Sequence, residues 1–275
     1  MKALILIVLG LLSFCTGFSQ FWYNDVLMTR ETMKRRDLLV QNRVSSVEFL
    51  SFDGSNQPIE GFSSQQVITG NGSTLTTTTT TGLSGTNRNI AEYDAKGLLK
   101  STIDTSDGNK ISIEYYYLPS NKLSRLISSS TSDGQFILKE EHIWTWNNNG
   151  RPEKMLKIKN GKDTTLVSFV FDEEGNLVEE RSHFRGKEQP AVFYYYDEQK
   201  RLTDIVRYNE RAQRLIPDYI FEYDANGRIA TMLVTSEGDY QKWFYTYDEK
   251  GLKTKDECYS KSKALIGKIQ YQYKY

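Results

Sequence analysis

Apolar and polar side chains alternate along much of the chain, and this period of two is typical of a β-strand with one buried face. Near the C-terminus, Ile269, Tyr271 and Tyr273 alternate with polar Gln270 and Gln272. Only five prolines occur in the whole sequence, which suits strands that need their backbone N–H donors. The pattern therefore predicts an all-β protein.

A short segment of the form aromatic-Asp-x-x-Gly-x-Leu repeats along the chain. Its clearest copies begin at Tyr93, Phe171 and Tyr223. Copies with one or more positions changed begin at Tyr117, Trp146, Tyr196 and Tyr247. Successive copies lie about 25 residues apart, which indicates one structural repeat per copy. We call these segments the aromatic–Asp turns.

The residue types in an aromatic–Asp turn have a physical reason. An Asp that begins a turn can accept a hydrogen bond from a backbone N–H two residues later. A Gly four residues after the aromatic residue supplies a positive φ without steric cost. The copy at Tyr196 carries Lys200 at this Gly position. The structural turn residues that we predict are Asp94, Gly97, Asp172, Gly175, Asp197, Asp224, Gly227, Asp248 and Gly251.

A second, Gly-containing turn lies midway through most of the units, for example at residues 106–109 and 160–162. Each unit would therefore hold two strands joined as a β-hairpin. About eight such hairpins in a row predict an antiparallel meander. We expect residues 45–275 to form this repeat domain, as a curved or rolled sheet.

Residues 20–44 precede the repeats and have a different pattern. Asn24 or Asp25 can cap a short helix that runs to about Arg35, with Leu27 on its apolar side. We therefore expect an N-terminal segment with a short helix before the sheet begins.

Residues 1–19 have the pattern of a signal peptide. Lys2 supplies a positive charge, and the apolar run of residues 3–12 is too short to span a bilayer comfortably. Gly17 and Ser19 fit the small-residue positions before a cleavage site. The prediction is an exported protein of the periplasm, the outer surface or the surrounding medium.

Two alternatives for this segment stay open. One is an uncleaved anchor, and the other is a lipoprotein anchored through Cys15, although Phe14 stands where a small residue is expected. After residue 20 no apolar stretch approaches the roughly 20 residues that a membrane helix needs, so no transmembrane segment is expected after cleavage.

The turn sequences YDAKGLL, FDEEGNL, YDEQKRL and YDANGRI resemble the YD repeats of the RHS-repeat family. The resemblance covers roughly residues 45–275, with a somewhat longer period than that of the family. It implies a β scaffold of the cell envelope or the outside of the cell, sometimes a sugar-binding one, and no catalytic residues. The chain is too short for the closed shells of long members of the family. A weaker resemblance is to the MORN-type repeats of bacterial antitoxin-like proteins.

The amino-acid composition limits the classes of partner that this protein is expected to bind. The 35 basic and 35 acidic residues balance, so no nucleic-acid partner is indicated. The 18 Tyr, 13 Phe and 4 Trp provide many aromatic side chains, which the alternation places mainly on a packed inner face. A few rings left at a sheet end or concavity would be candidates for stacking on a ligand, either an envelope glycan or another protein. The candidates are Trp144, Trp146, Tyr194, Trp243 and Tyr245.

Few residues offer catalytic or metal-binding chemistry. His142 and His183 lie too far apart for a metal motif, and we expect His142 to be a partly buried imidazole with a backbone partner and His183 to be solvated. The turn Asp residues fit turn capping better than calcium binding, since one carboxylate per repeat does not supply a full coordination shell. Cys258, which would be the only cysteine after cleavage, is expected to be half-buried. We predict no catalytic residues, no metal and no cofactor.

The sequence therefore predicts an exported, non-enzymatic scaffold or binding protein of the envelope. Two alternative functions, from other functional classes, remain open. One is a companion or immunity-type protein of a secreted toxin system. The other is a glycan-active enzyme that uses carboxylates such as Asp172 and Glu173, which the opposite orientation of adjacent strand residues disfavours.

Overall fold

The computed structural model describes residues 21–82, 84–210, 212–236 and 238–275. The predicted signal peptide, with its cleavage site and Cys15, lies outside the described residues. Within them the chain is an antiparallel β-meander preceded by one α-helix, so the predicted all-β class and strand order are confirmed. The chain divides into two compact units, which are described separately below. The expectation of one repeat domain over 45–275 stays a prediction.

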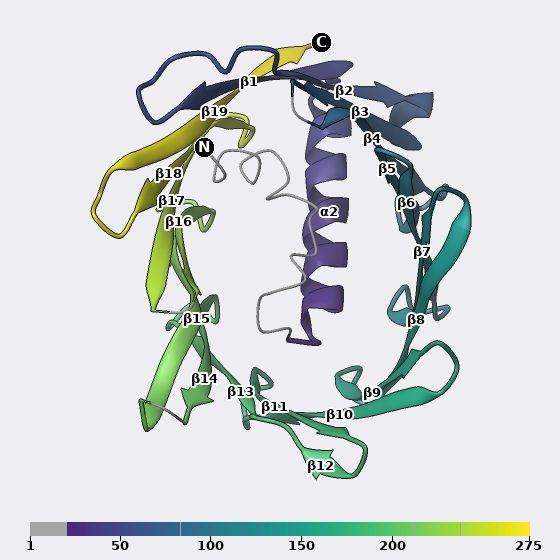
Figure 1. Ribbon diagram of the computed structural model, residues 1–275. Coiled ribbons are helices and arrows are strands. Elements are labelled where there is room, and N and C mark those ends of the chain that lie inside the picture. Colours follow the sequence, from purple (N-terminus) through teal and green to yellow (C-terminus); the bar gives the residue numbers. More distant parts are fainter. Residues whose placement is uncertain (1–20, 83, 211, 237) are drawn as a thin grey trace. The chain divides into compact units, whose positions relative to one another are not determined.

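The larger unit comprises Phe21–Val47, Ser64–Ala191 and the last two residues. In Figure 1 its strands form a curved sheet, and the helix α2 lies across the concave face of that sheet. Its elements are α2 (Asn24–Gln41), β2 (Ser63–Thr69), the 3-10 turn η1 (Gly70–Gly72), β3 (Thr74–Thr81), β4 (Gly85–Tyr93), β5 (Leu99–Ser106), β6 (Asn109–Tyr117), β7 (Leu123–Ser132), β8 (Gln135–Trp146), β9 (Pro152–Lys159), β10 (Asp163–Phe171), β11 (Leu177–Phe184) and β12 (Lys187–Glu188).

The smaller unit comprises, among the described residues, Glu48–Ser63 and Val192–Tyr273. It is built from consecutive antiparallel hairpins, each strand pairing with the next in sequence. Its strands are most of β1 (Ser46–Asp53), then β13 (Val192–Tyr196), β14 (Leu202–Asn209), β15 (Arg214–Tyr223), β16 (Ile229–Ser236), β17 (Asp239–Tyr247), β18 (Lys253–Ser260) and β19 (Leu265–Lys274).

The aromatic–Asp turns close the hairpins through their acidic side chain. Asp94 Oδ1 accepts hydrogen bonds from the backbone N–H groups of Lys96 and Leu98, at 2.8 and 2.9 Å. Gly97 has a φ of 81° and donates its N–H to the Asp94 carbonyl. The Tyr196 copy keeps the same turn although Lys200 must adopt a φ of 60°. Similar side-chain-to-backbone bonds are made by Asp53, Asn147, Asp172, Asp197, Asp224 and Asp248.

The aromatic residue of each turn couples neighbouring repeats. The Tyr223 hydroxyl donates a hydrogen bond to the carbonyl of Leu202, just after the preceding turn, at 2.7 Å. Arg201 from that preceding turn lies over the Tyr223 ring, 4.6 Å from its centroid. Hydrogen bonds of the same kind run from Tyr117 to Leu99, Trp146 to Leu123, Tyr247 to Ile229 and Tyr273 to Lys253. These repeats are therefore joined to the previous ones by a polar bond, several also by a cation–π contact, whereas Phe171, which has no hydroxyl, makes only the cation–π contact of these two links, with Arg151.

Alternation along the strands of the larger unit separates its two faces. On β10, Val167 and Phe169 are buried on the face towards α2, whereas Leu166 and Val170 are exposed on the other face. Met155 on β9 is also fully buried. The aromatic and aliphatic core thus lies between the sheet and the start of α2.

Replacing Gly227 with Val tests the positive-φ turn. A Cβ added at Gly227 would meet no atom closer than 3.9 Å, so the strain would come only from its φ of 75°. We expect Gly227→Val to lower the free energy of unfolding by about 1–3 kcal/mol in urea titration. Lys200→Gly should be neutral or stabilising, because the residue it replaces already has a positive φ. An Ala225→Val variant in the same turn that loses as much stability as Gly227→Val would contradict the assignment.

Candidate functional site at the start of helix α2

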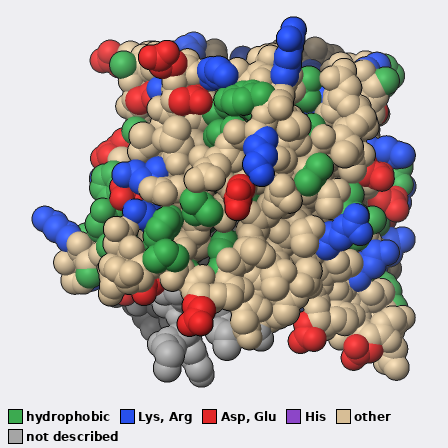
Figure 2. Space-filling model, turned by 90° about the horizontal axis from the view of Figure 1, so that it is seen from above, with side chains coloured by type: hydrophobic (Ala, Val, Ile, Leu, Met, Phe, Trp, Pro, Cys, Tyr) green, Lys and Arg blue, Asp and Glu red, His purple; other side chains and the backbone are tan. Residues whose placement is uncertain are grey.

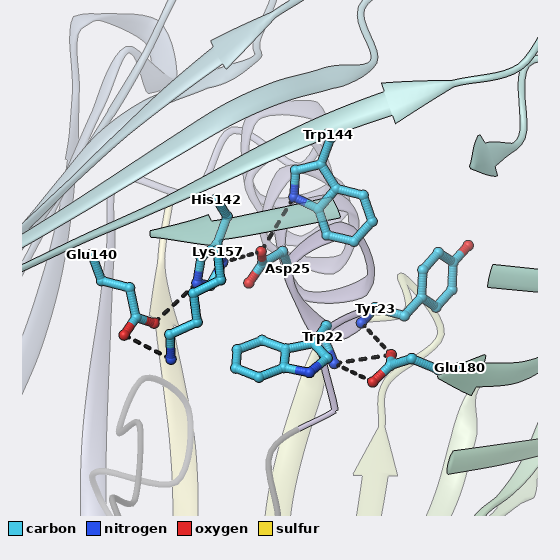
Figure 3. Close-up of polar contacts among 8 residues, drawn as sticks. All are labelled: Trp22, Tyr23, Asp25, Glu140, His142, Trp144, Lys157 and Glu180. Atoms are coloured by element: carbon cyan, nitrogen blue, oxygen red, sulfur yellow. Dashed lines mark hydrogen bonds and ion pairs between the residues drawn. The ribbon is translucent and has the colours of Figure 1, made fainter. Parts of the chain in front are cut away.

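A cluster of charged side chains lies where α2 begins, on the concave face of the larger unit (Figure 3). His142 and Trp144 are two residues apart on β8, so they point to the same face. Lys157 on β9 pairs directly with His142 in the antiparallel register and therefore shares that face. Asp25 reaches them from the first turn of α2.

His142 binds a carboxylate at each of its ring nitrogens. Its Nδ1 lies 2.6 Å from Asp25 Oδ2, and its Nε2 lies 2.9 Å from Glu140 Oε1. Trp144 Nε1 donates a further hydrogen bond to Asp25 Oδ2 at 3.3 Å. The second Glu140 oxygen forms an ion pair with Lys157 Nζ at 2.8 Å. Two acidic and two basic groups are thus paired in a site where only 3% of His142 is exposed.

The electrostatics of the cluster keep His142 charged. Burial alone would lower the pKa of His142, but the charge of Asp25 and the hydrogen bonds that the ring donates to both carboxylates raise it to about 9. Burial alone would raise the pKa of Glu140, but the hydrogen bonds from His142 and Lys157 lower it to about 2. At neutral pH the imidazole is therefore protonated and both of its nitrogens donate.

The backbone at the start of the helix is held by a second carboxylate. Glu180 on β11 is buried and accepts hydrogen bonds from the backbone N–H groups of Trp22 and Tyr23, at 2.9–3.0 Å. Negative charge here also complements the positive end of the helix dipole. Lys157 lies over the Trp22 ring, 4.6 Å from its centroid. Strands β8 and β9 therefore hold the side chains of the helix start, and β11 holds its backbone.

The arrangement fastens the start of the helix to the sheet. A protonated His142 with both nitrogens occupied cannot take up a proton, and its hydrogen-bond partners among the described residues are carboxylates, with no nucleophile between them. In the part of the chain that the structure describes, no group of three or more His, Cys, Asp or Glu side chains could hold a metal ion. The expected backbone partner of His142 was wrong, because two carboxylates reach the ring first.

The helix differs from the sequence expectation in length and capping. It extends to Gln41 rather than ending near Arg35. Neither Asn24 nor Asp25 caps it, since Tyr23 occupies the N-cap position without a side-chain bond and Asp25 turns to His142 instead. Sequence reasoning also missed Glu180, which is buried in phase with Ser182 on β11, and no feature of the sequence around it indicates an inward-facing acid.

The aromatic residues proposed for ligand stacking fall into two groups. Trp144 is 3% exposed and Tyr194 is 2% exposed, so both are packed on an inner face. Trp146 is half-buried and donates its indole N–H to the Leu123 carbonyl. Trp243 and Tyr245, in the smaller unit, are half-buried. Of the five candidates, Trp243 and Tyr245 are therefore the two that are partly exposed and do not bond the preceding repeat in the described part of the chain.

Other predicted residues have local structural roles. Asp172 accepts hydrogen bonds from both nitrogens of Asn176 within its own turn, so it is not directed at Glu173. His183 is exposed on β11. Cys258 is fully buried on β18 rather than half-buried, and burial raises the pKa of its thiol to about 12. No helix in the described residues has the length and apolar character to cross a membrane.

Comparison with known proteins finds distant similarities of fold. No family model and no curated protein sequence matches the chain. The Tc holotoxin pore from Photorhabdus luminescens shares 16% identity, over 77% of this chain and 12% of that one, with a TM-score of 0.35. A porin-like protein from Bacteroides uniformis shares 11% identity, over 84% of this chain and 98% of that one, with a TM-score of 0.44. A porin-like protein from Bacteroides vulgatus shares 12% identity over the same proportions, with a TM-score of 0.29.

These findings correct the expected family. The resemblance to the YD repeats of the RHS family, and the weaker one to MORN-type repeats, is wrong, because no family model matches and the neighbours matched over almost their full length are porin-like. The aromatic–Asp motif reflects turn chemistry that any array of β-hairpins can share. All three TM-scores lie below 0.5, so none of these likenesses assigns a function.

Replacing His142 with Gln tests the helix attachment. Removing one charge from a buried, balanced cluster should lower the free energy of unfolding by about 3 kcal/mol at neutral pH. The pKa of His142 is raised from 6.5 to about 9, so its stabilisation is complete below pH 6.5 and is lost as the pH rises through about 9. The difference between wild type and His142→Gln in urea unfolding should therefore shrink above that pH.

The matched control is His183→Gln, because His183 is exposed on β11. It should change the unfolding free energy little at any pH. A stability difference for His142→Gln that stays constant from neutral pH to well above pH 9 would show that the charge of His142 does not hold the helix.

Proposed function

We propose that this protein is an exported, non-enzymatic scaffold of the cell envelope that binds a neutral, hydroxyl-rich ligand such as an envelope glycan. The observation that carries the proposal is a band of side chains, most of them uncharged and polar, on the concave face of the larger unit, beside α2. Such side chains can donate and accept hydrogen bonds without attracting a highly charged partner.

The band follows the pairing of six consecutive strands, β3 to β8. Thr77 pairs with Asn89, and Asn89 pairs with Asp104 on the next strand. The adjoining row, two residues further along each strand, begins with the pairing of Thr79 with Asn87. We call the two rows the polar band, and its members are Thr77, Asn89, Asp104, Ile111, Ser130, Leu138, Thr79, Asn87, Ser106, Asn109, Ser132 and Gln135.

The polar groups of the band are held in fixed positions at its β4 end. Asn87 Nδ2 and Asn89 Nδ2 donate to the two oxygens of Asp104, at 3.0 and 3.3 Å. Apolar surface adjoins them, since Ile111, which pairs with Asp104, is 45% exposed. Ordered polar groups beside an exposed apolar side chain are the elements of a site that binds a polar ligand with an apolar face.

The opposite face of the larger unit supports a location in water. It carries charged pairs such as Arg125 with Glu141, at 2.6 Å, as well as exposed apolar residues such as Leu166. The molecular face in Figure 2 likewise shows acidic and basic side chains interspersed, with only small hydrophobic areas between them. These features suit an aqueous compartment of the envelope, and the export signal predicted for residues 1–19 supports the same placement.

Glycan binding can be tested with variants matched across the two faces of the sheet. Asn87→Ala combined with Ser130→Ala alters the polar band. Arg88→Ala combined with Ser129→Ala alters the adjacent positions, which point to the opposite face. We expect the purified wild-type protein to bind envelope glycans on an array, and the first variant to lose about tenfold in affinity because two hydrogen bonds are removed.

The second variant should bind as the wild type does. Equal losses in both variants would place the ligand elsewhere, and absence of any glycan binding by the wild type would refute a glycan as the ligand. Hydrolysis of a bound glycan would instead favour the enzyme alternative.

A further inference from the structure

A buried carboxylate in the smaller unit has one oxygen without a partner. Asp256, on β18, is 5% exposed and pairs with Tyr245 on β17 and with Ile269 on β19. Among the described residues, no hydrogen-bond donor reaches its Oδ1 atom. This residue belongs neither to an aromatic–Asp turn nor to the polar band.

The other oxygen of Asp256 is well satisfied. Its Oδ2 accepts a hydrogen bond from the Tyr271 hydroxyl at 2.8 Å and lies 3.1 Å from Lys253 Nζ. The Lys253 ammonium also lies 3.8 Å from the centroid of the Tyr245 ring. Tyr271 in turn packs edge-on against Phe49 of β1, which holds its ring in place.

The unpartnered oxygen is costly. Leaving a buried acceptor without a donor forfeits its hydration and destabilises the fold, more so when the group is charged. Buried polar groups in folded proteins are almost always paired, and an exception calls for an explanation. A ligand that donates a hydrogen bond to Oδ1 would remove this cost.

The surroundings specify the chemistry of that donor. A carboxylate beside the face of an aromatic ring attracts an ammonium group through both charge and the ring quadrupole. Lys253 already occupies this arrangement and so shows that an ammonium fits it. Its side chain is 28% exposed, against 7% for Asp256, so displacing Lys253 towards solvent would open the carboxylate.

We propose that Asp256, Tyr245 and Tyr271 form a binding site for the primary ammonium group of a ligand, with Lys253 as its built-in occupant. The ammonium group of the ligand replaces that of Lys253, so the net charge of the site does not change. It has three N–H donors, enough to serve both Asp256 oxygens where Lys253 serves one. The proposal does not depend on glycan binding at the polar band, which lies in the other unit.

The test uses n-butylammonium as the probe and NMR signals of the Tyr245 and Tyr271 rings as the readout. We expect saturable shifts in the full-length wild-type protein. Lys253→Met should bind the probe at least about tenfold more tightly, because the competing occupant is gone and a larger fraction of the protein is competent to bind. Asp256→Asn should show no saturable shifts.

Three controls make the result specific. Lys255→Ala, which removes a lysine paired with Glu257, should bind as the wild type does. Tetramethylammonium has no N–H donor and n-butanol has no charge, so both should bind much more weakly than n-butylammonium.

Other outcomes would overturn the proposal. Equal binding of n-butanol would mean that a neutral hydroxyl or a buried water serves Oδ1. No saturable shift in either the wild type or Lys253→Met would mean that the site takes no ammonium ligand. Should Lys253→Met fail to fold, Lys253→Arg provides the measurement, because the bulkier guanidinium fits the site of an ammonium poorly and should also raise the affinity for the probe.

Discussion

The hydrogen bond from one turn aromatic back to the preceding repeat is the interaction on which this fold depends. A β-hairpin on its own is marginally stable, so each hairpin must gain stability from its neighbour. The bond from Tyr223 to the Leu202 carbonyl and the stacking of Arg201 on the same ring supply a polar and an apolar link at one point. Because the partner carbonyl lies about one repeat earlier, the aromatic residue must recur with the period of the repeat.

The same contact explains which features could be read from the sequence. The turns at Tyr93 and Tyr223 were predictable because the Asp and the Gly act within the turn itself. The threonine-rich strand β3 was also predictable from its β-branched residues. The attachment of α2 was not, since Asp25 finds His142 more than a hundred residues away and nothing in its neighbourhood signals that partner. Local chemistry could be inferred, whereas pairing across the sheet could not.

The helix shows how strongly such distant pairing can override local pattern. Asp25 and Thr29 are buried on α2, whereas Met28 is 43% exposed. A helix that buries polar residues and exposes an apolar one gains little from the hydrophobic effect at that end. Its position there is specified by the paired charges of Asp25, His142, Glu140 and Lys157, which fix one register at the expense of desolvating four groups. Apolar burial contributes more at the other end of the helix, where Leu39 is fully buried.

Two buried carboxylates in this chain illustrate different uses of the same group. Glu140 has a basic partner at each oxygen, so its charge is balanced within the protein and its cluster is closed to a ligand. Asp256 is more deeply buried, with 7% of its side chain exposed against 16% for Glu140, and it has a lysine and a tyrosine at one oxygen and no donor at the other. The chain supplies a partner for each oxygen of Glu140, so the missing donor at Asp256 Oδ1 calls for an explanation. The incomplete shell around Asp256 therefore indicates a group that is supplied from outside the chain, and the ring of Tyr245 favours a cationic one.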